Sequence, residues 1–276
     1  EEIREGVRAV CEQFPDEYFR RIDEARGYPD DFVRALTSAG WLAALIPQEY
    51  GGSGLSLAEA SVIMEEINHS GGNSGACHGQ MYVMNVLVRH GTPEQRSTYL
   101  PKIASGEAIV TPAWLEPRNG FGPKGVQMRA EKQGQDFVLT GRKLHVAFAS
   151  SATRLLVLAR SGPGVEDIDL FLVDPHAKGI RLEQQKTLAS DTQYAVGFDG
   201  VRVPKGRILP PNPPGRTDIG THVTIAALTL GLGRAALEAR IAYARSVKWP
   251  SPVMWKTLAQ FHLLGDPSVH PVAGGG

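Results

Sequence analysis

The chain has 276 residues, of which 42% are hydrophobic and 21% are charged, values ordinary for a globular protein of two or three domains. Its 29 basic and 29 acidic residues cancel, so net charge gives no reason to expect binding to nucleic acid or to an anionic membrane. The sequence shows no signal-peptide pattern and no run of about 18 apolar residues. These features predict a cytoplasmic protein.

The sequence contains only two cysteines, Cys11 and Cys77, and they do not form a C-x-x-C pair. Isolated cysteines in a reducing compartment are usually buried and reduced. The pattern therefore predicts two buried free thiols rather than a disulfide or a metal site.

Residues 1–110 carry a helical pattern, in which apolar residues recur at three- and four-residue spacing and glycines mark the ends. Thr92 is a strong start signal, because it can cap a helix that begins at Pro93 while Gln95 bonds back to it. The expected helices cover Glu2–Phe14, Pro29–Gly40, Ser56–Ser70, Ser74–His90 and Thr92–Gly106.

Two features of this region are predicted to be structural although they resemble ligand sites. The Gly51–Gly54 loop lacks the preceding strand and the following Lys-Ser/Thr of a phosphate-binding loop, so it is interpreted as a turn. Met64, Met81 and Met84 are expected in the core, where methionine commonly fills gaps.

Residues 112–204 change to a β pattern. Short alternating runs recur about every 10–15 residues, with Gly, Pro or Asp-Gly between them, which predicts an antiparallel barrel or sandwich. The runs are Val126–Ala130, Phe137–Thr140, Leu155–Ala159, Asp169–Val173, Gly179–Leu182 and Gln193–Phe198.

After a proline cluster at 210–214 the pattern returns to helix. Residues 217–247 are apolar on nearly every face, which predicts a helix buried in a bundle. A short helix at Met254–Leu264 and a disordered tail from Asp266 are also expected. The predicted domains are a helical domain (1–110), a β-barrel domain (111–209) and a partial helical bundle (215–276).

Several segments carry recognisable motifs in a consistent order. Ile46–Leu55 is similar to a P-E-x-Y-G-G-x-G-L loop, and Tyr99–Gly106 to a Y-L-P-x-[IL]-x-x-G turn. Further matches are Leu115–Pro117 to T-E-P, Gly141–Lys143 to G-x-K, Phe198–Pro204 to F-x-x-V-x-V-P, and Leu230–Leu237 to a third-domain helix. This set, spread over residues 1–247, resembles the acyl-CoA dehydrogenase family.

The resemblance implies an all-α domain, an antiparallel β-barrel and a C-terminal four-helix bundle, of which residues after 215 supply at most two helices. It also implies FAD held between barrel and bundle, an acyl-CoA substrate, and an electron-transfer flavoprotein that reoxidises the flavin. The implied reaction is α,β-desaturation, in which a carboxylate removes the α-proton and the flavin accepts the β-hydride. The sequence is thus interpreted as a divergent, C-terminally shortened member.

By the same resemblance, the expected cofactor-binding residues are Trp114, Leu115, His145, Val146 and Ala147, and the expected substrate-binding residues are Gly120 and Phe121. Leu115, Phe121 and Ala147 stand where the family has polar side chains. Each lost hydrogen bond costs about 0.5–1.5 kcal/mol, so FAD is expected to bind more weakly, or to be lost. His145 replaces the family's Trp, and it either contacts flavin or substrate or has no role.

The catalytic base is unknown from the sequence. One family position for a catalytic Glu lies beyond residue 276, and the other falls near Thr221 and His222. His222 is a candidate, although a helix start disfavours its charged form. Asp218 is better interpreted as part of the helix start.

Two functions stay open: a FAD-dependent acyl-CoA dehydrogenase, and a non-catalytic or repurposed subunit that partners a catalytic homologue. The apolar helix at 217–247 would expose a large apolar surface in a monomer, which predicts a homo- or hetero-oligomer. The alternative is that residues after 248 are a truncated or frame-shifted remnant. No metal, nucleic acid or membrane contact is expected.

Overall fold

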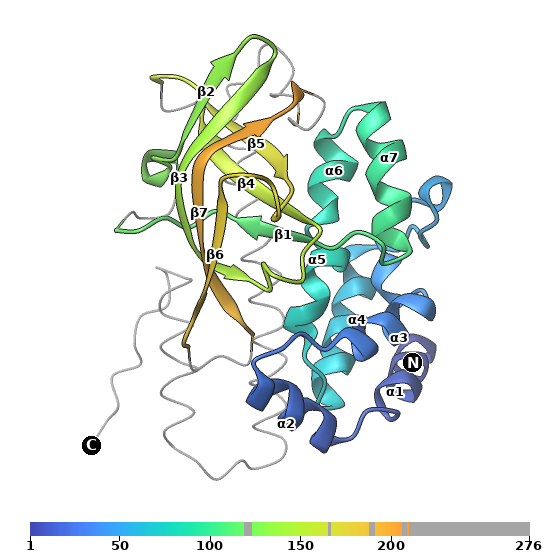
Figure 1. The fold of residues 1–276 in the computed structure, drawn as a ribbon. Helices are drawn as coiled ribbons and strands as arrows, with labels where there is room; N and C mark the ends of the chain where they lie inside the picture. Colours follow the sequence, from blue (N-terminus) through green and yellow to red (C-terminus); the bar gives the residue numbers. More distant parts are fainter. Residues whose placement is uncertain (119–122, 165–166, 188–190, 206–208, 210–276) are drawn as a thin grey trace, which may run out of the picture.

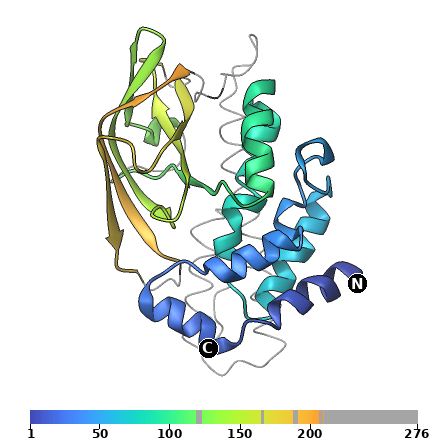
Figure 2. The same ribbon diagram turned by 45° about the vertical axis from the view of Figure 1, so that its right-hand side comes forward.

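The computed structural model describes residues 1–118, 123–164, 167–187, 191–205 and 209. Within them the helices come first and group on one side, and the strands follow and form a curled sheet beside the helices (Figure 1, Figure 2). This arrangement confirms the predicted order of an N-terminal helical domain and a β domain. The predicted helices after residue 215, with the oligomer contact assigned to them, lie outside the described residues.

The α-helices are α1 (Glu2–Cys11), α2 (Asp16–Ala25), α3 (Asp30–Ser38), α4 (Leu57–His69), α5 (His78–Met81), α6 (Met84–His90) and α7 (Pro93–Ala104). Short 3-10 helices are η1 (Trp41–Ala43), η2 (Gln48–Tyr50), η3 (Ser74–Cys77) and η4 (Pro123–Gly125). The helix expected over Ser74–His90 is divided into η3, α5 and α6. The amide N–H groups of Tyr82 and Val83 both donate to the carbonyl of His78, at 3.0 and 3.1 Å, which interrupts the regular spacing.

The start of α7 is the one the sequence predicts. The side-chain oxygen of Gln95 accepts from the Thr92 amide at 3.0 Å, and the Thr92 hydroxyl accepts from the Gln95 amide at 3.1 Å. Pro93 occupies the first helical position, where its missing N–H costs nothing. The two bonds satisfy otherwise unpaired donors at the helix end.

The Gly51–Gly54 loop is a packed turn, as predicted. A Cβ atom on Gly52 would lie 2.0 Å from the carbonyl oxygen of Ile46, and Gly51 has a φ of +87°. Both positions therefore require glycine. The loop closes against residues 43–46 through backbone hydrogen bonds from Ser53, Gly54 and Leu55.

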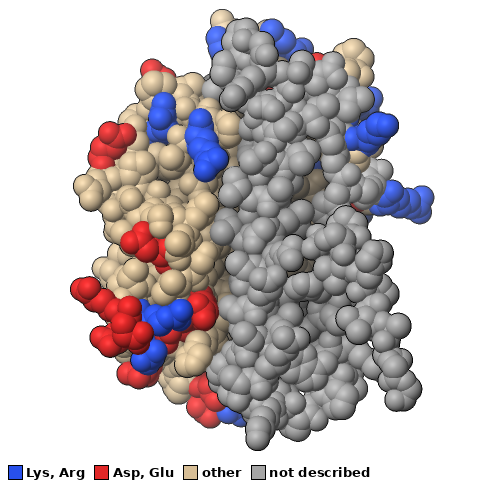
Figure 3. All heavy atoms as spheres, turned by 180° about the vertical axis from the view of Figure 1, so that it is seen from behind, with Lys and Arg blue, Asp and Glu red and all other residues tan. Residues whose placement is uncertain are grey.

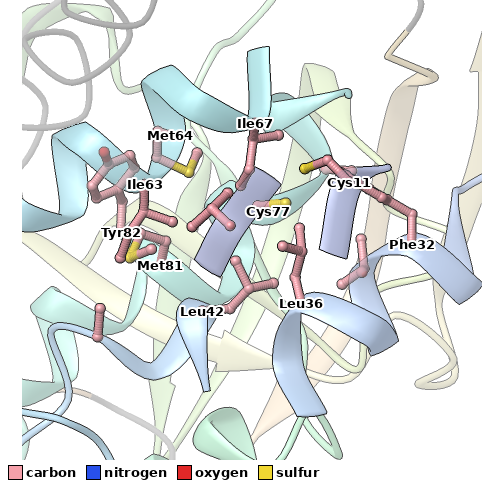
Figure 4. Packing of buried hydrophobic residues seen from close by; sticks show 14 of the residues in the cluster. Cys11, Phe32, Leu36, Leu42, Ile63, Met64, Ile67, Cys77, Met81 and Tyr82 are labelled. Carbon is pink, nitrogen blue, oxygen red and sulfur yellow. The ribbon is translucent and has the colours of Figure 1, made fainter. Parts of the chain in front are cut away.

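The largest apolar core of the helical domain, called here the helix cluster, contains buried side chains from α1, α3, α4 and α5 (Figure 4). Cys11, Met64, Cys77 and Met81 all belong to it, and each is at most 2% exposed. Met84 is equally buried in a neighbouring cluster. The predictions of free buried cysteines and of core methionines are confirmed.

Neither cysteine is expected to react with a thiol reagent while the protein is folded. Burial raises the pKa of Cys11 to about 11 and raises that of Cys77 well above its usual range. Since the thiolate is the reactive form, Ellman's reagent at neutral pH should release no colour until denaturant is added, and then two equivalents per chain. A native thiol that reacts as fast as free cysteine would contradict this packing.

The sheet contains β1 (Val110–Ala113), β2 (Arg129–Gln133), β3 (Asp136–Ala147), β4 (Arg154–Arg160), β5 (Ile168–Val173), β6 (Ile180–Gln185) and β7 (Gln193–Val203). The strand order is β1-β4-β2-β3-β7-β6, with β5 paired to β4. Each of the predicted runs overlaps one of β2 to β7. β1 was not predicted. It pairs in parallel with β4, as β2 does through Arg129 and Arg160, whereas β2–β3, β3–β7, β4–β5 and β6–β7 are antiparallel as expected.

Strands β4 and β5 separate two apolar clusters. Leu155, Val157 and Phe171 face the sheet cluster, which fills the inside of the curled sheet. Leu156 and Leu170 face the interface cluster, which includes Val83, Met84 and Leu100 of the helical domain. Burial on both faces explains why β4 reads as a continuous apolar run.

Among the described residues, no helix is both long and apolar enough to cross a membrane. On the face seen in Figure 3, acidic and basic side chains stand next to one another over the described part of the surface. In the same residues, no group of three His, Cys, Asp or Glu side chains could hold a metal ion.

Candidate functional site

The residues predicted to bind the cofactor lie on two segments that run side by side. We call Trp114, Leu115 and His145–Ala147 the bulge site. The Thr111 hydroxyl donates to the Ala147 carbonyl at 2.7 Å, and the Leu144 amide donates to the Leu115 carbonyl at 2.8 Å. The structure therefore brings together two stretches that are about thirty residues apart in the sequence.

A β-bulge in β3 shapes this site. The pairing of β3 with β7 shifts between Lys143 and Val146, so three steps along β3 match two along β7. His145 lies in the bulge with a φ of +54°, and its amide donates to the Gln185 side chain at 3.0 Å. A bulge changes the direction of the side chains that it carries. At this bulge, the His145 imidazole is exposed.

The predicted residues differ in what their side chains face. Val146 is fully buried in the sheet cluster, so only its backbone could meet a ligand. Ala147 packs against the helix cluster. Leu115 is half-buried and belongs to none of the clusters formed by the described residues, which leaves its side chain available.

Trp114 packs against the interface cluster with its ring half-buried. Its indole nitrogen is fully buried, yet it has no hydrogen-bond partner among the described residues. Buried polar groups without partners are uncommon and call for an explanation. A ligand that accepts a hydrogen bond would supply one.

A buried ion pair lies directly beneath the bulge site. The Lys143 ammonium donates to the Glu116 carboxylate at 2.7 Å and to the Trp114 carbonyl at 3.3 Å. The side chains of Lys143 and Glu116 are 0% and 5% exposed. The Glu116 carboxylate also accepts from the amides of Gln127 and Met128 at 2.9–3.1 Å. Burial lowers the pKa of Lys143, and the attraction of Glu116 opposes that shift.

Phe148 anchors the other end of the site in the helical domain. Its φ of +51° is unusual for a bulky residue, and its side chain is buried. The ring packs edge-on against Tyr28 with centroids 5.1 Å apart, and its amide donates to the Thr192 carbonyl at 2.8 Å. The segment 145–147 is thus held between a bulge and a docked aromatic ring.

The structure describes only some of the residues that the sequence assigns to the site. Gly120, Phe121 and His222 lie outside the described residues. Glu116 and Lys143 were named only within motifs, and neither of them nor Phe148 was predicted to belong to the site. The burial of Lys143 could have been predicted, because every second side chain of a strand points to the same face. Counting in steps of two from Leu139 places Lys143 on the inner face of β3.

Comparison with known proteins gives a consistent result. Residues 1–107 match the family model of the acyl-CoA dehydrogenase N-terminal domain, and residues 112–201 match that of the acyl-CoA dehydrogenase middle domain. A mitochondrial isovaleryl-CoA dehydrogenase of Pongo abelii is 29% identical, over 88% of this chain and 61% of the relative. A probable acyl-CoA dehydrogenase of Bacillus subtilis is 27% identical, over 95% of this chain and 72% of the relative.

Solved structures agree with these matches. The Tcur3481-Tcur3483 steroid ACAD superposes with a TM-score of 0.71 at 26% identity, covering 95% of this chain and 71% of the other. Glutaryl-CoA dehydrogenase from Mycobacterium smegmatis gives a TM-score of 0.74 at 26% identity, over 96% and 72%. The chain spans 61% to 72% of the length of these relatives.

Proposed function

Because the chain belongs to the acyl-CoA dehydrogenase family, we propose that it is a flavoprotein oxidoreductase that desaturates an acyl-CoA thioester between its α and β carbons. The observation that supports this best is the bulge site, where the segment that carries Leu115 runs beside residues 144–147 and is bonded to them. Acyl-CoA is the proposed substrate, and an electron-transfer flavoprotein in the cytoplasm is the proposed electron acceptor.

The residues of the bulge site suit a flavin. Leu115 and the part of Ala147 that the helix cluster leaves uncovered offer apolar surface, and the buried indole N–H of Trp114 is a donor without a partner among the described residues. The His145 imidazole is exposed beside them, while its amide is already bonded to Gln185. When bound, FAD would supply the acceptor for the β-hydride.

The chain's own residues limit where the α-proton can go. Glu116 is not the base, because Lys143 and the amides of Gln127 and Met128 already bond its carboxylate. His222 stays the proposed base. Gly120 and Phe121 stay the proposed contacts to the acyl group. The proposed assembly is an oligomer formed through the helix at 217–247.

A second function is favoured by the apolar side chains at the site. Leu115 and Ala147 stand where the family motifs carry hydroxyls, so flavin would be held without those hydrogen bonds. One solved relative is named for two components, Tcur3481 and Tcur3483. The second candidate is therefore a non-catalytic subunit that pairs with a catalytic homologue.

Visible absorption spectra separate the two functions. The purified protein is titrated with FAD and freed of unbound flavin, and a panel of acyl-CoA thioesters of increasing chain length is added without oxygen. A bound flavin that bleaches with at least one thioester supports the enzyme. A protein that keeps no flavin under these conditions contradicts it and supports the subunit.

A further inference from the structure

The burial of the Glu116–Lys143 ion pair is not explained by a gain in stability. It is buried on the inner side of the sheet, where taking two charges out of water usually costs as much as their attraction returns. Replacement of such pairs by apolar residues is often neutral for stability. The pair therefore calls for a role other than stability.

The hydrogen bonds of the pair indicate such a role. Glu116 bonds to the amides of Gln127 and Met128, at the start of the path into β2. Lys143 is the last residue of β3 before the bulge. Its ammonium donates to Glu116 and to the carbonyl of Trp114. Three separate stretches of backbone are thus tied to one ion pair.

We propose that Glu116 and Lys143 are positioning residues that hold Trp114 and Leu115 against the bulge of β3. This inference rests on the proposed function, in which Trp114 and Leu115 contact the flavin. The hydrogen bond from the Leu144 amide to the Leu115 carbonyl reports directly on that position. It should weaken when the pair is disturbed.

Glu116→Gln tests the proposal with a side chain of nearly the same shape. The new amide group places N–H donors against the Lys143 ammonium or against the backbone amides, so one of the present bonds must break. We expect the dissociation constant for FAD to rise at least about tenfold, the factor that corresponds to one charge-assisted hydrogen bond. The flavin absorption band should also shift.

A double variant separates positioning from stability. Glu116→Gln with Lys143→Met removes the unpaired buried charge, so the unfolding midpoint should return toward that of the wild type. FAD binding should stay weak, because Lys143 no longer reaches the Trp114 carbonyl. Return of both stability and FAD affinity would overturn the proposal.

Glu66→Gln is the matched control. Glu66 is a buried carboxylate of α4 that pairs with Arg4 at 3.4 Å and with Arg8 at 2.9 Å, so these ion pairs stay within the helical domain. The Glu66→Gln variant should unfold more easily, while its dissociation constant for FAD stays within about twofold of that of the wild type. Equal losses of FAD affinity in Glu66→Gln and Glu116→Gln would show a general effect of unfolding and overturn the proposal.

A readout on the protein without flavin keeps the test independent of the proposed function. Hydrogen exchange of the peptide that contains Leu144 should speed up in Glu116→Gln and in the double variant, and stay unchanged in Glu66→Gln. Unchanged exchange in all three overturns the positioning role. A wild type that binds no FAD overturns the proposed function, while exchange at Leu144 still decides whether the pair holds the segment.

Discussion

Phe148→Ala is expected to lower the free energy of unfolding by about 3–5 kcal/mol, the usual cost of removing a buried phenylalanine ring. The ring is 5% exposed and packs on Tyr28 in the helix cluster, so its loss leaves a cavity where the two domains meet. Urea unfolding followed by circular dichroism measures the change.

The backbone at Phe148 gives this prediction an internal check. At a φ of +51° an alanine keeps the steric penalty of a left-handed conformation, about 1–2 kcal/mol, whereas a glycine does not. Phe148→Gly should therefore be more stable than Phe148→Ala, the reverse of the usual order. At Val146, which is buried without a positive φ, the alanine variant should be the more stable one. The usual order at both positions would contradict the conformation described here.

Leu115→Thr combined with Ala147→Thr is expected to tighten FAD binding. The two hydroxyls restore the side-chain donors that the family motifs carry at these positions, and each hydrogen bond contributes about 0.5–1.5 kcal/mol. Together they correspond to a fall of roughly 5-fold to 150-fold in the dissociation constant. Titration followed by flavin fluorescence measures it.

Leu115→Val combined with Ala147→Val is the matched control, since valine has the shape of threonine without the hydroxyl. Equal affinities for the valine and threonine variants would mean that the hydroxyls find no acceptor on the flavin. In that case Leu115 and Ala147 do not line the cofactor site.

The sequence allowed most elements of the fold to be predicted where local signals were strong. The cap at Thr92 and the apolar runs of β4 and β7 are local patterns, and the helix start and the two strands were found where these patterns predicted them. The helix α2 and the strand β1 were missed. β1 has only four residues, one of them Pro112, and is defined by its parallel pairing with the distant β4.

For the candidate site, the sequence indicated only those residues that belong to recognisable motifs. The resemblance implied that Leu115 and His145–Ala147 bind one cofactor, and the structure places their two segments side by side, with the Leu144 amide bonded to the Leu115 carbonyl. The ion pair of Glu116 and Lys143 could not be predicted, because burial of both charges depends on contacts between segments 27 residues apart. The positive φ of Phe148 occurs where its ring packs into the helix cluster, a contact between distant segments that no local pattern indicates.

Hydrogen exchange of the full chain with and without FAD tests the central claim, that the bulge site holds the flavin. FAD should slow exchange in peptides that cover residues 111–116 and 143–148, and leave α1 and α2 unchanged. Bound FAD that protects other segments and leaves residues 111–116 and 143–148 unchanged would contradict the site assigned here.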